Sequence, residues 1–430
     1  MDLVVDLHIH SHFSRATSKD MDLPNLYKWG KIKGINIIGT GDFTHPAWFS
    51  QIQDELEPAE PGLFKLKDEL AKIQDQQLPE SVKSNLIRFI LTAEISTIYS
   101  KYDRVRKLHH LIVAPDLATV SAINSSLSQI GNLKSDGRPI LGLDSARLLK
   151  IILDINPNCL LIPAHIWTPW FSLFGSKSGF NTIEEAFGNL SNHIFAVETG
   201  LSSDPFMNWR FSALDHLTLV SHSDAHSPSK LGLEANVLNC QLSYQDIVGA
   251  VKTNDQRMLG TIEFFPQEGK YHYDGHRSCG ISLSPDDSFR HRNLCPKCGK
   301  KLTLGVDHRV GELADRPVDF KPQNHKQVEY IVPLAEILAE IRQVKSSQNQ
   351  FVLTEYLRVT AALGSEFSLL RQISLDDISR VGFSQLSLAI SRLRSGQVSV
   401  QPGYDGVFGV IKVLSQLSSS STYSGQTSLL

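Results

Sequence analysis

The sequence is poor in cysteine and has no long hydrophobic run. Its 430 residues contain five cysteines, at positions 159, 240, 279, 295 and 298, and no apolar stretch approaches the ~20 residues of a membrane-spanning helix. An odd cysteine count with three members close together indicates a reducing compartment and a metal site rather than disulfides. The N-terminus has no basic segment followed by a long apolar stretch, which excludes a signal peptide. We therefore expect a cytoplasmic protein with no membrane partner.

The overall charge and composition exclude few classes of protein. The formal net charge is −3, so charge alone does not indicate a nucleic-acid binder, although local patches matter more than the sum. The chain is long enough for one large domain with smaller appendages, it shows no internal repeat, and we expect a monomer. Changes in sequence texture predict four parts: residues 1–265 as an α/β domain, 266–311 as a zinc-ribbon-like module, 312–415 as a mostly helical region and 416–430 as a flexible tail. Within the helical region, residues 328–344 and 353–363 are candidate helices.

The first part alternates short apolar runs with longer polar stretches. The runs are 3–9, 35–40, 86–93, 111–114, 159–164, 194–197 and 217–221. Such runs are typical of buried strands, and the helix-length segments between several of them predict a parallel sheet with helical crossovers. Seven such strands can close into a barrel, and a flat doubly wound sheet is the alternative.

Potential metal ligands follow most of these runs. They are Asp42, Glu94, the pair His109 and His110, His165, Glu198, Asp224 and His226, in addition to His8 and His10 at the end of the first run. Polar residues at the carboxyl ends of parallel strands meet on one rim, where α/β barrels keep their active sites. The sequence therefore predicts a cluster of His, Asp and Glu side chains on that rim.

The pair His8 and His10 is the start of this cluster. Two residues apart on a strand, the two imidazoles project from the same face and can chelate a divalent metal. Two or three metals about 4 Å apart activate water and neutralise a leaving oxygen, which favours a phosphate ester as substrate. A carboxylate must bridge them, and Glu94 or Asp224 would serve, so His8, His10, Glu94 and Asp224 are the candidate catalytic residues. The alternative, for His12, His45, Glu198 and His222, is a hydrogen-bonding role at a strand end.

These motifs resemble the PHP (polymerase and histidinol phosphatase) superfamily. The resemblance is carried by Asp6-x-His8-x-His10, Thr40-Gly41-Asp42, Glu94, the 109/110 pair, His165 and Asp224-x-His226. It implies a distorted seven-stranded barrel with three metal sites. The first would be held by His8, His10, Glu94 and Asp224, the second by Glu94, His110 and His165, and the third in part by Asp42 and His226. The superfamily more often has His where Asp42 stands, and His110 is preferred to His109 because it lies nearer the apolar run.

A second metal site is indicated downstream. Cys295-x2-Cys298-Gly is a zinc knuckle, and His276-x2-Cys279 precedes it, so these four residues predict one structural zinc. The fourth ligand stays open, because the histidines at 272, 291 and 308 compete with His276. Basic residues of this module, including Arg277, could contact phosphates, and a solvated basic face is the alternative.

Longer strings resemble the endonuclease Q family. They are DLHIHS at 6–11, GTGD at 39–42, PWFSLFGSKSG at 169–179, ETGLSSDP at 198–205, SDAHS at 223–227, YHYDGHRSCG at 271–280 and CPKCG at 295–299. The resemblance implies a PHP-type barrel, a zinc module, two or three divalent ions (Zn, Mn or Mg), and incision of DNA 5′ of deaminated bases (uracil, hypoxanthine, xanthine) and abasic sites. A PHP-type phosphatase acting on a small molecule such as histidinol phosphate is the alternative enzyme, and a DNA-binding or clamp-associated adaptor is the non-enzymatic one.

Two further segments indicate contacts with partners. The stretch after His165 is rich in aromatic residues, so Trp167, Trp170, Phe171, Ser172 and Lys177 are candidates for the wall of a pocket for a flipped base, with core packing as the alternative. The end of the tail, Gln426-x-x-Leu429-Leu430, is similar to the peptides that bacterial sliding clamps bind.

Overall fold

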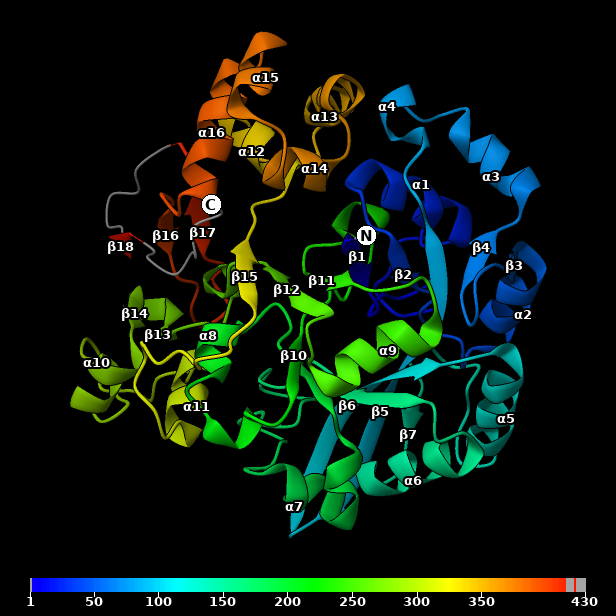
Figure 1. Cartoon of the computed structure of the whole chain (residues 1–430). Coiled ribbons are helices and arrows are strands. Elements are labelled where there is room, and N and C mark those ends of the chain that lie inside the picture. Colours follow the sequence, from blue (N-terminus) through cyan, green and yellow to red (C-terminus); the bar gives the residue numbers. More distant parts are fainter. Residues whose placement is uncertain (1, 415–420, 423–430) are drawn as a thin grey trace. The chain divides into compact units, whose positions relative to one another are not determined.

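The computed structural model describes residues 2–414 and 421–422, which fold into two compact units (Figure 1). The first unit comprises the chain up to Leu78, Lys83–Gly200 and Ala213–Thr261; the second comprises Pro79–Val82, Leu201–Ser212 and the chain from Ile262 onward. The domain boundaries after residues 265, 311 and 415, which we predicted from changes in composition, remain predictions. The peptide Gln426–Leu430 lies outside the described residues. Among the helices described, none is long and apolar enough to cross a membrane.

The first unit is built on mixed β-sheet. Its strands are β1 (Asp2–Asp6), β2 (Ile37–Gly39), β3 (Leu56–Pro58), β4 (Phe64–Leu66), β5 (Arg88–Lys101), β6 (Arg104–Ala114), β7 (Ile140–Leu141), β8 (Leu160–Pro163), β9 (Ala196–Glu198), β10 (Thr218–Val220), β11 (Ala235–Asn239) and β12 (Met258–Glu263), the last ending in the second unit. The pairs β1–β2, β2–β5 and β9–β10 are parallel, as predicted. The pairs β1–β11, β5–β6 and β6–β8 are antiparallel, so the expectation of a wholly parallel sheet is wrong.

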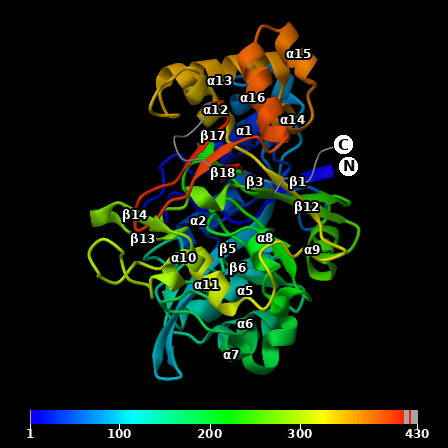
Figure 2. The same ribbon diagram turned by 90° about the vertical axis from the view of Figure 1, so that its left-hand side faces the viewer.

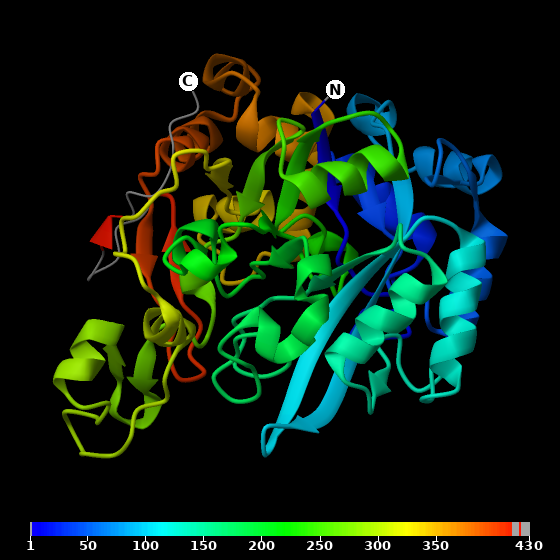
Figure 3. The same cartoon turned by 60° about the horizontal axis from the view of Figure 1, so that its bottom comes forward.

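The largest difference from the expected topology is the β5–β6 hairpin. The sequence predicts two separate short strands here, whereas β5 and β6 are 14 and 11 residues long and form one hairpin, drawn in cyan in Figure 3. Its turn is Tyr102–Asp103, between the paired residues Lys101 and Arg104, with φ angles of 53° and 55°. Two consecutive positive φ angles are typical of the two-residue hairpin turn whose twist matches that of the flanking strands. The chain therefore passes directly from β5 to β6 without a helical crossover.

The helices of this unit are α1 (Leu23–Lys33), α2 (Pro46–Glu55), α3 (Asp68–Asp75), α5 (Leu117–Ser128), α6 (Ser145–Ile155), α7 (Ile183–Phe187) and α9 (Tyr244–Thr253), and along the chain the short α4 (Glu80–Lys83) spans the division between the two units. Of these, α1, α2, α5 and α9 contact strands, and α3 packs on α1. Local sequence sets where α1, α5 and α6 begin, because Asp22, Asp116 and Asp144 each accept a hydrogen bond from a backbone N–H of the first turn. The core between sheet and helices is apolar and includes Val5, Ile37 and a further set of fully buried residues such as Ile90, Leu111, Ile162 and Val220.

The second unit contains the cysteine-rich segment and a group of helices. Its strands are β13 (Asp274–His276), β14 (Ile281–Leu283), β15 (Gln327–Tyr330), β16 (Ser399–Gln401), β17 (Val410–Lys412) and β18 (Ser421–Thr422). Its helices are α8 (Pro205–Asn208), α10 (Pro285–Arg290), α11 (Val306–Leu313), α12 (Leu334–Ile341), α13 (Gln350–Leu363), α14 (Glu366–Arg371), α15 (Leu375–Arg380) and α16 (Ser384–Arg394). Helices α12–α16 gather into one bundle (Figure 2). The predicted helix over 328–344 is shorter than expected, because β15 occupies its first residues and α12 begins only after Pro333.

Candidate metal centre

Two groups of potential metal ligands lie in the first unit and share one residue. The first group is His8, His10, Glu94 and Asp224; the second is Glu94, His109 and His165. Within each group, the ligand atoms all lie within 4.8 Å of one another. Residues far apart in sequence therefore meet as the positions of the apolar runs predicted, and Glu94 belongs to both groups.

The carboxylate of Glu94 is the centre of this arrangement. Its Oε1 lies 2.7 Å from His109 Nδ1 and 3.1 Å from His165 Nε2, while its Oε2 lies 3.3 Å from His10 Nε2. Glu94 is fully buried on β5. A buried carboxylate with imidazole nitrogens facing both oxygens has the geometry of a ligand that bridges two cations.

Backbone strain accompanies this site. Asp42, His165 and Asp224 have φ angles of 49°, 30° and 47°, in the left-handed region that residues with a Cβ rarely adopt. Each such conformation costs on the order of 1–3 kcal/mol and persists only where the surroundings impose it. Next to Asp42, Gly41 also has a positive φ of 62°, and a Cβ there would lie 2.5 Å from the carbonyl oxygen of Ile9. The sharp turns after the strands therefore help to direct these side chains towards one another.

Two further carboxylates orient the first histidine pair. Glu198 accepts hydrogen bonds from Nδ1 of His8 at 2.9 Å and of His222 at 2.8 Å, and from the backbone N–H of His165 at 2.8 Å. Asp42 Oδ1 accepts from His10 Nδ1 at 3.0 Å. Carboxylates behind ligating histidines fix the tautomer and the ring orientation. The Nε2 atoms of both rings then face Glu94 and Asp224.

The donor set fits divalent ions. His8 Nε2 is buried and makes no hydrogen bond, although it lies 3.5 Å from Glu94 Oε1 and 3.7 Å from Asp224 Oδ1. His109 Nδ1 and His165 Nε2 lie 3.2 Å apart and both face Glu94 Oε1. Mixed imidazole and carboxylate donors suit Zn and Mn. An unpartnered buried nitrogen aimed at two carboxylates is the observation that a bound cation explains.

The pKa values of these groups are shifted by their burial and by their charged neighbours. Burial acts against the charged form of Glu94, yet the neighbouring His109, Arg138 and His8 hold its pKa well below the ordinary value. Burial by itself disfavours the charge on His8 too, but Glu198 and Glu94 raise its pKa well above normal. Burial lowers the pKa of His109 to about 4, which leaves this ring neutral and able to act as a ligand at pH 7.

The adjacent histidines on β6 have different roles, and the predicted preference is wrong. His110, expected as the ligand, points away from Glu94, and its Nε2 pairs with Ser145 Oγ at 2.9 Å and Thr97 Oγ1 at 3.3 Å. The antiparallel register explains this, because His109 pairs with Ser96 and shares the face of Glu94, whereas His110 pairs with Ile95 on the opposite face.

The remaining two predicted ligands lie beside the groups rather than in them. Asp42 accepts hydrogen bonds from His10 and from the hydroxyls of Ser11 and Ser14, and it is not in either ligand group. The ring of His226 lies next to that of His10, with centroids 4.6 Å apart and the planes tilted by 53°, and its Nδ1 lies 2.7 Å from the carbonyl oxygen of Asp224. Among the residues that the structure describes, no third ligand group therefore forms around Asp42 and His226.

Two residues at the site were missed or undervalued by sequence reasoning. Arg138 Nη1 donates to Glu94 Oε2 at 2.9 Å, and it lies in a loop between α5 and β7 with no motif to reveal it. Glu198 was left open as a strand-end group, and its position after an apolar run was the signal for its role. Asp6 lies outside the ligand groups and accepts hydrogen bonds from the backbone N–H and the hydroxyl of Ser223. It thereby positions the segment that carries Asp224.

The candidate base-pocket residues fall into two classes. Trp167 is buried and packs on Phe174, with ring centroids 5.0 Å apart, and Ser172 is buried and donates to the carbonyl of Thr168. These two are core residues, so the prediction that they line an accessible pocket is wrong. Trp170 is 49% exposed and Lys177 is also exposed. Phe171 is half-buried, has a positive φ of 61°, and places its ring 4.6 Å from that of His109, next to the metal-ligand groups.

The second unit contains the predicted zinc cluster. The ligand atoms of His276, Cys279, Cys295 and Cys298 lie within 4.8 Å of one another. The competing histidine at 308 is instead held by Asp274 at 2.6 Å, and those at 272 and 291 lie outside the cluster. His276 is thus the fourth member, and a closed Cys3His set is typical of structural zinc. Arg277 is exposed, and its backbone N–H donates to Asp405 Oδ2 at 2.6 Å.

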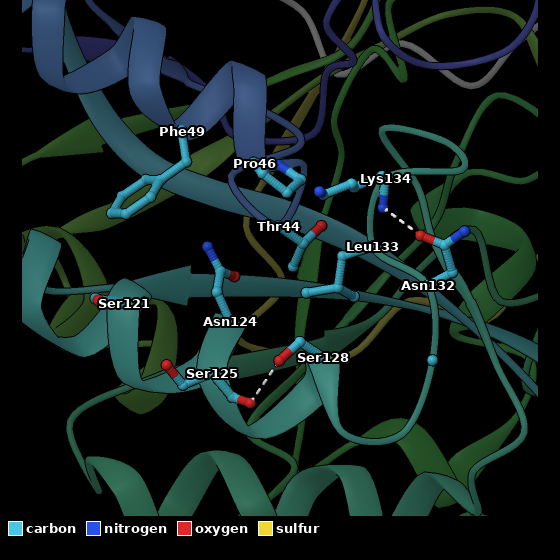
Figure 4. A pocket seen from close by; sticks show the side chains of 11 residues that line it. Thr44, Pro46, Phe49, Ser121, Asn124, Ser125, Ser128, Asn132, Leu133 and Lys134 are labelled. Carbon is cyan, nitrogen blue, oxygen red and sulfur yellow. Dashed lines mark hydrogen bonds between the residues drawn. The ribbon is translucent and has the colours of Figure 1, made fainter.

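A separate cavity of about 480 Å³ lies on the first unit between α2, α5 and the loop that follows α5 (Figure 4). Its lining is mostly hydroxyl and amide side chains, with Phe49 and Leu133, and includes no His, Cys, Asp or Glu. It is therefore not part of the ligand groups.

Comparisons with known proteins agree with the sequence resemblance. No protein-family model matches the sequence. The uncharacterized protein YqxK of Bacillus subtilis (strain 168) is 30% identical over 429 residues, which cover 95% of this chain and 99% of the relative. The lesion-specific endonuclease PfuEndoQ from Pyrococcus furiosus is structurally similar with a TM-score of 0.82 at 29% identity, over 96% of this chain and 95% of that one. Endonuclease Q in complex with a 27-mer duplex carrying an abasic lesion at the active site gives a TM-score of 0.80 at 28% identity, over 97% and 99%.

These matches confirm the predicted α/β fold class, with a sheet that is mixed and not wholly parallel. They extend over nearly the whole chain and include both units. The chain belongs to the endonuclease Q family of the PHP superfamily.

Proposed function

We propose that the chain is a metal-dependent DNA repair endonuclease that hydrolyses the phosphodiester 5′ of deaminated bases (uracil, hypoxanthine, xanthine) and of abasic sites. The observation that carries the proposal is the carboxylate of Glu94, shared between two groups of buried ligands. Similarity over nearly the full length to a lesion-specific endonuclease supports the substrate class. A phosphatase for a small molecule such as histidinol phosphate is the less supported alternative.

In this proposal, His8, His10, Glu94 and Asp224 hold one divalent ion, and Glu94, His109 and His165 hold a second. Bound there, such ions lower the pKa of water and neutralise developing negative charge on the phosphate. The residues of the chain orient the ligands: Glu198 keeps the proton of His8 on Nδ1, and Asp42 does the same for His10.

Zn or Mn suits the imidazole-rich donor set better than Mg, which prefers oxygen ligands. The four residues His276, Cys279, Cys295 and Cys298 hold a separate, structural zinc. Loss of this zinc should unfold its own segment without changing the ligands of the first unit.

The surface next to the ligand groups is suited to DNA. Phe171 offers an aromatic face beside His109, and the ammonium of Lys107 lies 5.5 Å from the centre of the Phe171 ring. Base stacking on an aromatic ring contributes about 1–3 kcal/mol per base. We therefore place the unpaired or extruded nucleotide against Phe171, with exposed Trp170 and Lys177 as further contacts to the strand.

The test uses purified protein reconstituted with Mn or Zn and duplexes that carry one deoxyuridine, one deoxyinosine, one abasic site or none. A nick only in the lesion-containing strands supports the proposal. Asp224→Asn should abolish nicking and retain DNA binding, whereas Asp154→Asn, an exposed carboxylate on α6, should behave as wild type. Hydrolysis of histidinol phosphate without any DNA nicking would favour the alternative.

Three sequence predictions stay predictions: the monomeric state, the cytoplasmic location, and clamp binding through Gln426–Leu430. Deletion of residues 426–430 followed by a binding measurement with a bacterial sliding clamp tests the last of them.

A further inference from the structure

Both carboxylate oxygens of Asp42, the residue expected to hold a third metal ion, already accept hydrogen bonds. Its Oδ1 accepts from His10 Nδ1 at 3.0 Å. Its Oδ2 accepts from the backbone N–H of Ser11 at 2.7 Å, the hydroxyl of Ser11 at 2.7 Å and the hydroxyl of Ser14 at 2.8 Å. Three donors on one carboxylate oxygen occupy the lone-pair directions that a cation would need.

The loop that follows α5 closes the same side of Asp42. A Cβ on Gly137 would lie 2.3 Å from Asp42 Oδ2 and 2.4 Å from Ser14 Oγ, so the backbone passes directly over this carboxylate. No third group of three or more ligand atoms within 4.8 Å occurs among the first unit's described residues. The arrangement that would suit a third ion in the superfamily is therefore absent at Asp42.

The residue after this glycine brings a permanent positive charge to the ligand groups. Arg138 Nη1 donates to Glu94 Oε2 at 2.9 Å, and its side chain is 24% exposed. Burial opposes the charge on Arg138, but Glu94 and Asp224 more than compensate and raise its pKa. A guanidinium has five N–H donors, so a bond to Glu94 leaves several for another ligand.

The backbone on both sides of Arg138 is anchored. The N–H of Gly137 donates to the carbonyl of Phe13 at 3.0 Å, and the N–H of Arg138 donates to Asp136 Oδ1 at 3.1 Å. The carbonyl of Pro139 accepts from Ser96 on β5 at 3.0 Å. Such anchoring holds the guanidinium in place before a substrate arrives, which is the condition for strong electrostatic stabilisation of a transition state.

We propose that Arg138 takes the place of a third metal ion: two ions bind in the first unit, and the Arg138 guanidinium contacts a non-bridging oxygen of the scissile phosphodiester. This inference rests on the proposed function, because it needs a phosphodiester as substrate. In the reaction, the water oxygen bonds to phosphorus and the bond from phosphorus to the oxygen of the leaving nucleotide breaks. That oxygen takes a proton, the water loses one, and Arg138 keeps its own protons while donating hydrogen bonds to the charged phosphoryl oxygens.

The test measures bound metal and activity in the same full-length preparations. Wild type, Arg138→Ala, Arg138→Lys and the control Arg147→Ala, an exposed arginine on α6, are dialysed against Mn or Zn and analysed for ions per chain. Incision of an abasic-site duplex and hydrolysis of bis(p-nitrophenyl) phosphate are then measured at saturating metal.

The wild type should bind two ions in the first unit plus the zinc of the cluster. Arg138→Ala should bind the same number at equal or higher affinity, because a positive charge is lost beside Glu94, while kcat falls by roughly 10²–10³-fold, as for loss of one oxyanion donor. Arg138→Lys should recover part of the rate, because it retains the charge but not the planar fork. Arg147→Ala should match the wild type in ion count and rate.

Three ions in the wild-type first unit would overturn the proposal. A purely structural role for Arg138 would appear as loss of bound metal in proportion to lost activity, and that result would also overturn it. Failure of the proposed function is distinguishable: the wild type would then not nick the abasic-site duplex, while the effect of Arg138→Ala on bis(p-nitrophenyl) phosphate would still support the inference.

Discussion

Replacing Glu198 by glutamine tests how the site is held together. Glu198 is 1% exposed, and its pKa is lowered to about 2: burial alone would raise it, but His8 and His222 outweigh that effect. It is therefore an ionised acceptor at neutral pH. His222 Nδ1 contacts Oε1, the backbone N–H of His165 contacts Oε2, and His8 Nδ1 lies between the two oxygens, at 2.9 Å from Oε1 and 3.0 Å from Oε2.

The magnitude follows from this geometry. Glutamine has the same shape, but one of its terminal atoms is an NH2 group. If that group takes the position of Oε1, it faces the N–H groups of His8 and His222; at the position of Oε2, it faces the N–H groups of His165 and His8. In either orientation buried donors meet without an acceptor, which costs about 1–3 kcal/mol of stability. Loss of the orienting carboxylate should also weaken metal binding by about 10–100-fold.

The assay is chemical denaturation of the metal-free protein together with calorimetric titration of Mn into the same variant. Glu184→Gln, an exposed carboxylate on α7, is the control and should change neither quantity. Metal affinity equal to wild type in Glu198→Gln would refute the claim that this carboxylate sets the orientation of His8.

Three further predictions address other parts of the molecule. His109→Ala should lose the second of the two bound ions, whereas His110→Ala should keep both and lose only stability, as measured by elemental analysis and denaturation. Cys295→Ser should release the zinc of the second unit and increase proteolysis around that segment, while the ion content of the first unit stays constant. The Arg88 hydrogen bonds keep the pKa of Glu60 below its ordinary value of 4.5, so their stabilisation is present above pH 4.5 and is lost as pH falls through the lower folded pKa. Glu60→Gln should therefore lower the free energy of unfolding by about 1 kcal/mol at pH 7. The variant should also lose less stability than the wild type when the pH is lowered from 7 to 3, as measured by denaturation at each pH.

The ligand groups were largely predictable because each ligand is tied to a strong local pattern. His8 and His10 follow a buried run at a spacing of two, and Glu94, His165 and Asp224 stand at the ends of other runs. The carboxyl ends of the parallel neighbours β1 and β2 meet at one edge, which groups the residues that follow them. Glu94 belongs to the same site although it lies within β5 and not at its end, so for this residue the apolar run marked the site but not the end of the strand.

The choice between His109 and His110 needed information that local patterns do not contain. Neighbours on a strand face opposite sides, so the choice depends on the register of β6 against β5. That register is set by the two-residue turn at Tyr102–Asp103, where neither residue is a glycine or an asparagine that would announce such a turn.

Arg138 and Asp42 depended on tertiary structure in the same way. Arg138 reaches Glu94 from a loop of irregular structure, with no periodicity to reveal it. Asp42 has the residue type and the position of a metal ligand, but the hydroxyls of Ser11 and Ser14 donate to its Oδ2 and His10 Nδ1 donates to its Oδ1. Whether a carboxylate has free oxygens is a property of the folded site and not of the motif.

An incision experiment shows whether the site around Glu94 hydrolyses DNA specifically at lesions. Metal-loaded protein is incubated with an end-labelled duplex that contains a single deoxyuridine, and the products are mapped at nucleotide resolution against an unmodified duplex and against Glu94→Gln. We expect a single metal-dependent nick on the 5′ side of the deoxyuridine, none in the unmodified duplex, and none with Glu94→Gln. A folded, metal-loaded wild type that leaves the lesion strand intact, or that cuts both duplexes alike, would contradict this expectation.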